Sequence, residues 1–522
     1  MTESVCHAYL FEARGIQRFL FASGRLRDML SGSELIDSLC APGGHLDQVL
    51  ATLSLQAKPV RQAGGAFYLL LQDRSAAERL CAAWRLACAR WLPGLEVIDA
   101  LASATSARKA IQQGMAKLRE ARNALSPALP NASALARRSP RTGLAAAGKI
   151  EGEWLDAATL AQRTFHRDPA TGSLTRRFLD EPGLIWPSDF SDSAHPQNAF
   201  PLGERRLVGL LHMDGNGLGE VLRQLSDGLA TADDDTYVRL YHHFSSGLAQ
   251  ATARAAAEAS RAVLLPAARQ HVMPARPLVL GGDDISLLIR PDLALAFASH
   301  FLGAFETETG RLMEQLASLL RANRLNCDFL PAHLTACGGL VIMKASHPFM
   351  AGHDLAEQLC ARAKRDSREA REHGASAASR VAFLKLQDSL VDDATLQTRG
   401  YVIDGTAGTN QLSSYDVTGH NIPLLQDLVA LADSVGTSLN PRPLREIAAL
   451  MEDAPGLAEA ASQRWRALNR QALPAFDTAL ARLLPENRHA SLPIARNDNA
   501  AWQGPLHDLL TLLSAREEAP RD

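Results

Sequence analysis

Carboxylates that could bind divalent cations stand at two places in the sequence. Asp214 follows an apolar run, RLVGLLHM, and precedes the turn-forming sequence Gly-Asn-Gly. Asp283 and Asp284 occur in RPLVLGGDDISLLIR, where two apolar strand-like runs flank a four-residue turn. If these strands are neighbours in one sheet, three carboxylates meet at one edge. Carboxylates that close repel one another strongly, so the cluster makes most sense as a site for Mg²⁺ or Mn²⁺.

A cation site of this kind suggests nucleotide chemistry. Two divalent cations about 4 Å apart can activate a 3′-hydroxyl and bridge the triphosphate of a nucleotide. Gly281 and Gly282 directly precede the two aspartates, and without a Cβ atom their backbone can approach a phosphate closely. The competing interpretation of Gly-Gly-Asp-Asp is an ordinary tight hairpin turn. From these residues alone both interpretations stay open.

The order of the strand and helix signals along the chain predicts a duplicated α+β fold. Residues 1–125 give strand and helix signals in the order β-α-β-β-α-β, which is the ferredoxin-like arrangement of palm domains, and Ser33 is expected to cap a helix. Residues 126–200 are rich in turn-forming residues and are predicted to be a connector. The same order recurs over 201–390, and residues 391–522 have mainly helical periodicity. We therefore expect two palm domains and a helical C-terminal domain.

The composition is that of a soluble globular protein. The chain has 522 residues, of which 46% are hydrophobic and 21% charged, and this excludes a mainly disordered state. A net charge of −3 argues against nucleic-acid binding by bulk charge. No apolar run approaches the roughly 18 residues of a membrane span, and the N-terminus does not have the pattern of a secretory signal. Seven cysteines without a Cys-x-x-Cys motif fit a reducing cytoplasm.

The motifs around the carboxylates resemble a known family. HMDGNGLGEVL followed by LVLGGDDISLL resembles the catalytic palm of the large subunit of type III CRISPR effector complexes, which is similar in turn to GGDEF-type nucleotide cyclases. AEQLCARAKRDSR resembles the late helix of the GGDEF family, whose lysine reaches the triphosphate and corresponds to Lys364. The N-terminal unit resembles the first, degenerate palm of the same subunit, at Gly15-Ile16-Gln17-Arg18-Phe19, Leu26-Arg27-Asp28, Gly32-Ser33 and Gly64-Gly65-Ala66-Phe67.

The resemblance implies an activity and a set of site residues. Members of this family convert ATP into cyclic oligoadenylate when their complex binds target RNA. Asp214, Asp283 and Asp284 are then the catalytic and metal-binding residues, with Mg²⁺ or Mn²⁺ as the cofactor. The implied partners are ATP or another nucleoside triphosphate, guide and target RNA, and the other subunits of a type III-like complex, and a homo-oligomer is also open. The expected nucleotide-binding residues are Gly215, Asn216, Gly217, Gly281, Gly282, Ser286 and Lys364.

Three features depart from the family pattern. Asn216 stands where the family often has a second aspartate, and an amide would weaken a second metal site. The connector RSPRTGLAAAGKIEGEWLDA lacks the cysteines of the family's zinc knuckle. The first palm-like unit begins close to Met1, so we expect the family's HD nuclease domain to be missing.

Several alternatives stay open at this stage. The protein could be a catalytically weak scaffold of an RNA-guided complex, or a diguanylate-cyclase-like dimer, although no R-x-x-D site precedes the Gly-Gly motif. Lys364 could belong to a solvated helix end. The doublet His353-Asp354 is expected on a solvated helix face rather than in an HD hydrolase site. Basic residues of the first palm could contact RNA or a nucleotide, or could be ordinary surface charge; they are Arg14, Arg18, Arg25 and Arg27.

Overall fold

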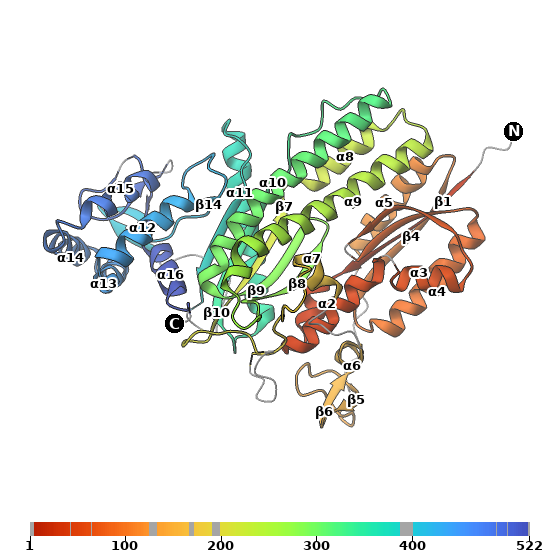
Figure 1. Ribbon diagram of the computed structural model, residues 1–522, viewed down its shortest axis with the longest axis horizontal. Coiled ribbons are helices and arrows are strands. Elements are labelled where there is room, and N and C mark those ends of the chain that lie inside the picture. The colour runs from red at the N-terminus through yellow and green to blue at the C-terminus, as the bar shows by residue number, and fades with distance from the viewer. Residues whose placement is uncertain are drawn as a thin grey trace.

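The computed structural model describes residues 5–41, 43–63, 65–124, 133–165, 172–190, 199–386, 400–486, 488–497 and 500–519. Its fold is α+β, as predicted. Figure 1 shows the N-terminal unit at one end of an elongated molecule and the C-terminal helices at the other, with the second α+β unit between them. In the part of the chain that the structure describes, no helix combines the length and the low polarity that crossing a membrane requires.

The first unit is built on a four-stranded antiparallel sheet. The strands lie in the order β2-β3-β1-β4, which is the ferredoxin-like order that the sequence predicts. Its strands are β1 (Cys6–Arg14), β2 (Ala57–Ala63), β3 (Ala66–Leu71) and β4 (Glu96–Ala104). Its helices are α1 (Ile16–Phe21), α2 (Leu26–Cys40), α3 (His45–Thr52), α4 (Arg74–Trp91) and α5 (Ala107–Arg122).

The prediction that Ser33 caps a helix is wrong. Ser33 lies in the middle of α2, whose buried side chains begin at Leu26. Its hydroxyl donates a hydrogen bond to the backbone oxygen of Leu278 in the second unit. A serine that bonds across an interface has the same sequence signature as a capping serine, so the pattern alone could not separate the two roles.

The segment predicted to be a connector contains regular structure. It forms the hairpin β5 (Ala146–Ile150) and β6 (Glu153–Asp156), followed by α6 (Ala157–Thr164) and α7 (Ser173–Phe178). Helix α6 packs on α2, and α7 packs on α2 and on the second unit. The predicted domain boundary near residue 125 lies outside the described residues.

The second unit repeats the first with additions. Its sheet has the order β14-β11-β10-β7-β9-β8, so β10, β7, β9 and β8 reproduce the order of the four strands of the first unit. The strands are β7 (Leu207–Gly215), β8 (Ala275–Gly281), β9 (Asp284–Ile289), β10 (Ala336–Lys344), β11 (Arg380–Lys385) and β14 (Tyr415–Asp416). The helices are α8 (Leu218–Gly228), α9 (Asp234–Ala259), α10 (Pro291–Ala322) and α11 (Phe349–Glu372), and short π and 3-10 turns (Ser260–Leu264 and Leu265–Ala267) follow α9.

The C-terminal region is helical, as predicted, but it also holds a small sheet. The sheet has the order β12-β13-β16-β15, and its strands are only two to four residues long. They are β12 (Gly400–Ile403), β13 (Thr406–Thr409), β15 (Ala495–Arg496) and β16 (Trp502–Gln503). The helices are α12 (Leu425–Ser438), α13 (Pro441–Asp453), α14 (Pro455–Leu468), α15 (Leu473–Leu483) and α16 (Leu506–Arg516).

Polar contacts join this region to α11 and β11. Asp366 on α11 accepts a hydrogen bond from the hydroxyl of Ser414, and Ser414 accepts one from Arg380 at 2.8 Å. The Tyr415 hydroxyl donates to Asp508 at 2.6 Å. Burial raises the pKa of Asp508 to about 7, although its hydrogen bonds oppose the shift. The C-terminal region is therefore fixed to the same helix that approaches the carboxylates.

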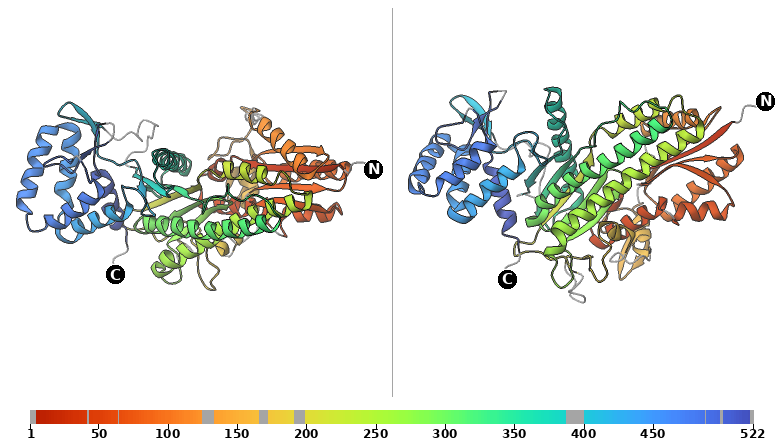
Figure 2. Two further views of the ribbon diagram at one scale, coloured as in Figure 1. Left: turned by 90° about the horizontal axis from the view of Figure 1, so that it is seen from above. Right: turned by 45° about the horizontal axis from the view of Figure 1, so that its top comes forward.

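Helix α11 lies unusually close to the sheet. A Cβ atom at Gly339 of β10 would stand 1.9 Å from the backbone oxygen of Ala356 and 2.7 Å from the backbone nitrogen of Cys360. Figure 2 shows α11 standing against the sheet of the second unit. Only glycine allows this approach, because the atoms that it meets belong to a helix backbone.

Gly339→Ala should therefore push α11 away from the sheet and lower the free energy of unfolding by about 2–3 kcal/mol. Urea denaturation followed by circular dichroism measures this loss. The matched control is Gly303→Ala in α10, where a Cβ atom would meet nothing within 4 Å and alanine should be neutral or slightly stabilising. Equal stability of the two variants would contradict the close packing.

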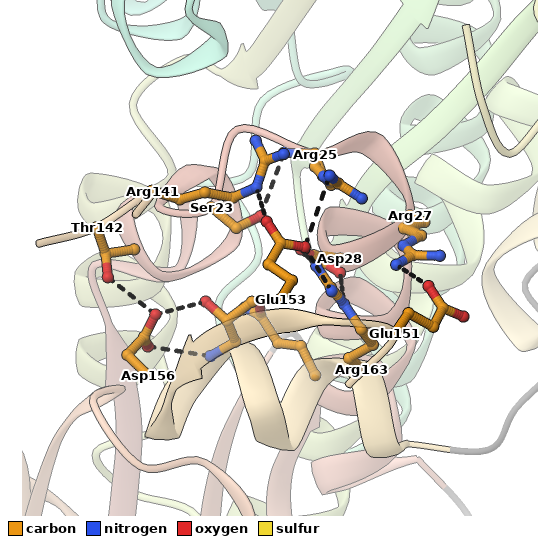
Figure 3. Close-up of polar contacts among 12 residues, drawn as sticks. Ser23, Arg25, Arg27, Asp28, Arg141, Thr142, Glu151, Glu153, Asp156 and Arg163 are labelled. Atoms are coloured by element: carbon orange, nitrogen blue, oxygen red, sulfur yellow. Dashed lines mark hydrogen bonds and ion pairs between the residues drawn. The ribbon is translucent and has the colours of Figure 1, made fainter. Parts of the chain in front are cut away.

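An ion-pair cluster fixes the connector hairpin to the first unit (Figure 3). Arg163 on α6 pairs with Asp28 of α2 at 2.7 Å and with Glu153 at 2.8 Å, and the side chains of Arg163 and Asp28 are only 7% and 0% exposed. Arg25 and Arg141 also reach Glu153. Burial alone would raise the pKa of Glu153, but its hydrogen bonds to arginine lower it to about 2.

Asp28→Ala should leave the Arg163 guanidinium buried without its main partner and should cost about 3–5 kcal/mol of stability. Arg27→Ala is the matched control, because the Arg27–Glu151 pair is exposed and its loss should cost less than about 1 kcal/mol. Chemical denaturation of both variants measures the difference. A similar small loss in both would show that the buried pair does not hold the connector.

Candidate active site

The structure brings the three carboxylates of the sequence motif to one edge of the second sheet. Strands β7 and β9 are antiparallel neighbours with Met213 opposite Ile285, so Asp214 and Asp284 lie at adjoining ends. Asp283 occupies the turn between β8 and β9. A Cβ atom at Gly215 would stand 2.7 Å from the Asp283 carboxylate, so the residue after Asp214 must be small for the turn to close over it.

A side chain of α9 hydrogen-bonds to the backbone of the Gly-Gly-Asp-Asp turn. Gly281 pairs with Asp284 across the hairpin, and Gly282 has a φ of +60°, a left-handed conformation that favours glycine. The Gly282 carbonyl accepts a hydrogen bond from the Thr252 hydroxyl at 2.6 Å. The turn is thus fixed by a helix rather than by solvent.

Lys364 reaches the cluster from α11. Its ammonium donates to Asp214 Oδ2 at 2.5 Å and to the Gly215 carbonyl at 2.8 Å. Burial opposes the charged form of Lys364, but Asp214 outweighs it and raises the pKa of the lysine. Lys364 is therefore not part of a solvated helix end, and its charge neutralises one carboxylate of the three.

The environment disfavours the charged form of the two remaining aspartates. Burial and the nearby Asp214 raise the pKa of Asp283 to about 7, and burial and Asp214 also raise the pKa of Asp284 well above its usual value. The Asp284 Oδ1 atom is buried and accepts no hydrogen bond, and it lies 3.3 Å from His212 Nδ1. A carboxylate oxygen without a hydrogen bond beside two other carboxylates fits a divalent-cation site.

Asn216 and Ser286 lie beside the carboxylates and contact other side chains of the protein. The Asn216 amide donates to the Thr335 hydroxyl at 2.9 Å and its backbone nitrogen to the Thr335 carbonyl at 2.8 Å. Ser286 is fully buried, and its hydroxyl lies 3.0 Å from His212 Nδ1. The geometry thus gives Ser286 a contact to His212 in place of the direct nucleotide contact that we predict from the sequence. Gly217 has a φ of +65° and starts α8.

The first unit lies close to β8, the strand that leads into the Gly-Gly-Asp-Asp turn. A cavity of about 70 Å³ lies between the two units, lined by residues of α2 and β8 together with Gln17, Gly65 and Asp284. On the same side, Arg177 of α7 donates to the Leu280 carbonyl at 3.0 Å and pairs with Asp37 of α2. The strand that leads into the turn is therefore supported by both α2 and α7.

The basic residues of the first palm are used within the protein. Arg14 donates to the backbone oxygen of Arg122, and Arg18 lies 3.9 Å from Glu96. Arg25 and Arg27 pair with glutamates of the connector hairpin, as Figure 3 shows. The Arg18 side chain is nevertheless 82% exposed, and a contact of this cluster with RNA or a nucleotide stays a prediction. The sequence could not reveal the ion pairs, because the partners of Arg25 and Arg27 lie more than 120 positions away.

The prediction for His353 is wrong. Its side chain is 1% exposed, and its ring lies against Phe21 and His212 instead of facing solvent. His212 is likewise buried, and burial lowers its pKa. His212 lies two residues before Asp214 in the sequence. Its contact with His353, which is about 140 residues further on in α11, could not be predicted from the sequence.

The fold and site together define a protein of two ferredoxin-like palms in which only the second carries the carboxylates. No protein-family model matches the sequence, and no curated protein matches it. Solved structures share the fold along the whole chain. One is the crystal structure of a Csm1-Csm4 cassette in complex with cA4, with a TM-score of 0.53 and 16% identity over 100% of this chain and 70% of that chain. Another is a Csm1-Csm4 cassette in complex with pppApA, with a TM-score of 0.51, 16% identity and the same coverage.

Asp283→Asn should change the pH dependence of stability. The raised pKa means that the folded protein holds a proton on Asp283 more tightly than the unfolded chain does between pH values near 4 and 7. The stability that this proton contributes is present at low pH and is lost as the pH rises through about 7. Without metal, the variant should therefore melt at a higher temperature than the unsubstituted protein at pH 8, with little difference at pH 5.

Thermal denaturation in EDTA at both pH values measures this difference. Asp227→Asn is the control, because Asp227 is an exposed carboxylate of α8 that pairs with Arg223. If Asp283→Asn behaves as this control does at both pH values, the carboxylates do not repel one another as the geometry requires.

Proposed function

We propose that the chain is a large subunit of the type III CRISPR kind, and that its second palm is a metal-dependent nucleotidyltransferase that joins ATP into a cyclic oligoadenylate. The observation that carries the proposal is the carboxylate cluster of Asp214, Asp283 and Asp284 with Lys364 beside it. Its support from outside the chain is the fold shared with cassettes that were crystallised with cA4 and with pppApA.

The residues of the site suit this reaction. Asp214, Asp283 and Asp284 would hold Mg²⁺ or Mn²⁺, which supplies the positive charge that lowers the pKa of a 3′-hydroxyl and offsets the charge of a triphosphate. The 3′-oxygen bonds to the α-phosphorus, the bond from that phosphorus to pyrophosphate breaks, and the hydroxyl proton passes to solvent. Gly281 and Gly282 leave the backbone open to the phosphates. No side-chain nucleophile is needed.

Lys364 has two roles in this proposal. In the protein without nucleotide it neutralises Asp214, which limits the repulsion within the cluster. With a nucleotide bound, its ammonium would stand beside the phosphates and stabilise the charge that develops on the departing pyrophosphate. The first unit, which lacks the carboxylates, would hold the turn in place and face the second nucleotide.

The partners of the chain are part of the same proposal. We infer guide and target RNA and further type III subunits as partners, since the similar structures are assemblies of Csm1 with Csm4. The near-balanced charge of −3 is compatible with this proposal, because partner subunits could carry the RNA.

A scaffold without strong activity is the second candidate. It is favoured by Asn216, which has an amide where a further carboxylate would strengthen cation binding, and whose NH₂ group is tied to Thr335. In this case the carboxylate edge would bind nucleotide weakly, and the chain would act through its contacts with other subunits.

The two candidates are separated by incubating the full-length protein with Mg²⁺ or Mn²⁺ and each labelled nucleoside triphosphate, with products identified by mass spectrometry. We expect a linked or cyclic adenylate that Asp283→Ala/Asp284→Ala reduces at least about 1,000-fold, because that variant removes two of three cation ligands. Glu314→Ala, an exposed carboxylate on α10, is the matched control and should leave the product unchanged.

Other results of this experiment are also decisive. A product that persists in the double variant would contradict the proposed site. No product together with no metal-dependent ATP binding would establish the scaffold. If the protein binds ATP in a metal-dependent way but forms no product, the same assay is repeated with target RNA and type III partner subunits. Inactivity under those conditions would overturn the proposal that the chain is an enzyme.

A further inference from the structure

A second group of metal-ligating side chains lies on α11, distinct from the carboxylates of the candidate active site. His353, Asp354 and Glu357 each offer one ligand atom, and these three atoms all lie within 4.8 Å of one another. The helix explains their proximity, because Glu357 is four residues after His353 and three after Asp354, and both spacings place side chains on one helix face. His353 Nδ1 points towards Glu357, at 3.8 Å from Oε1.

The imidazole of this group is buried and has no hydrogen bond. The His353 side chain is 1% exposed, its Nε2 is buried without a partner, and 3.8 Å is too long for a hydrogen bond from Nδ1. Its ring is held by Phe21 on one side and His212 on the other, with centroids 5.0 Å and 5.3 Å away. A cation beside Glu357 would bind Nδ1, which has a carboxylate oxygen 3.8 Å away and no hydrogen bond, and not the buried Nε2.

The protonation of the group also suits a ligand. Burial, with a smaller contribution from His212, lowers the pKa of His353 to about 3, so the imidazole is neutral at physiological pH and keeps a lone pair. Asp354 and Glu357 are exposed carboxylates, and burial together with their mutual repulsion raises the pKa of Glu357. A cation between the two carboxylates would relieve that repulsion.

We propose that His353, Asp354 and Glu357 bind one transition-metal cation of the Mn²⁺ and Zn²⁺ class. One imidazole with two carboxylates is a donor set that these ions accept, whereas Mg²⁺ prefers oxygen donors alone. The exposed side of the group leaves the remaining coordination positions to water. The site adjoins the catalytic carboxylates, because the ring of His212 packs against His353 and stands 3.3 Å from Asp284.

This proposal does not depend on nucleotide turnover, so direct metal binding tests it. The full-length chain carrying Asp283→Asn/Asp284→Asn is stripped of metal and titrated with Mn²⁺, followed by electron paramagnetic resonance. We expect one remaining bound Mn²⁺ whose pulsed spectrum shows coupling to a nitrogen nucleus. Zn²⁺ should displace it at lower concentration than Mg²⁺ does.

Adding Asp354→Asn/Glu357→Gln should weaken the binding of Mn²⁺ at least about tenfold and remove the nitrogen coupling. Both carboxylates are exposed, so these changes should leave the circular dichroism spectrum unaltered. His373→Gln, at the other end of the same helix, is the matched control and should bind Mn²⁺ as before.

Three outcomes would overturn the proposal. The first is no Mn²⁺ binding in the Asp283→Asn/Asp284→Asn protein, and the second is binding without nitrogen coupling. The third is binding that Asp354→Asn/Glu357→Gln leaves unchanged. None of them bears on whether the unsubstituted protein joins ATP, so the two proposals fail separately.

Discussion

The repulsion among Asp214, Asp283 and Asp284 is the constraint on which the rest of the site depends. Strand pairing forces the three carboxylates together, since Met213 opposite Ile285 and Gly281 opposite Asp284 leave no other register. Three features of the fold hold the carboxylates in place against this repulsion. Thr252 fixes the turn, glycine at 215 allows the close approach, and Lys364 supplies one positive charge. The repulsion that these contacts do not remove would be relieved by bound cations.

The first palm supports this arrangement through backbone contacts. Ser33 bonds to the Leu278 carbonyl and Arg177 to the Leu280 carbonyl, so the strand entering the Gly-Gly-Asp-Asp turn is held at two points. Buried apolar side chains of both units also form common clusters, in which Leu30 and Trp84 belong to one unit and Val341 and Leu359 to the other. A palm that has lost its own carboxylates thus still determines where those of its neighbour stand.

The sequence predicted the parts of the structure that local patterns encode. The strands β7, β8 and β9 are continuous apolar runs that end at turn residues, and both palms repeat one order of elements, so their pairing and the carboxylate edge could be inferred. Strands of two to four residues, such as those of the small C-terminal sheet, are too short to show a period. That sheet could not be predicted.

Long-range pairing was equally hidden. The surroundings of His353 depend on Phe21 and His212, and the partners of Arg25 and Arg27 lie in a distant hairpin. A polar residue looks the same in a sequence whether it faces water or a partner from another segment. The sequence therefore identified the residues of the site but not the contacts behind them.

Helix α11 makes the active site sensitive to mechanical displacement. Lys364 and Asp366 are two residues apart, about 3 Å along one helix axis, and one holds Asp214 while the other holds Ser414 of the C-terminal region. A helix is stiff over that distance, and Gly339 leaves α11 no space to shift towards the sheet. Ser414 directly precedes β14, which pairs with β11 in the same sheet, so a displacement of this segment would reach Asp366 and, through the helix, Lys364. The net charge of the carboxylate edge is in this way linked to the position of the segment that carries Ser414.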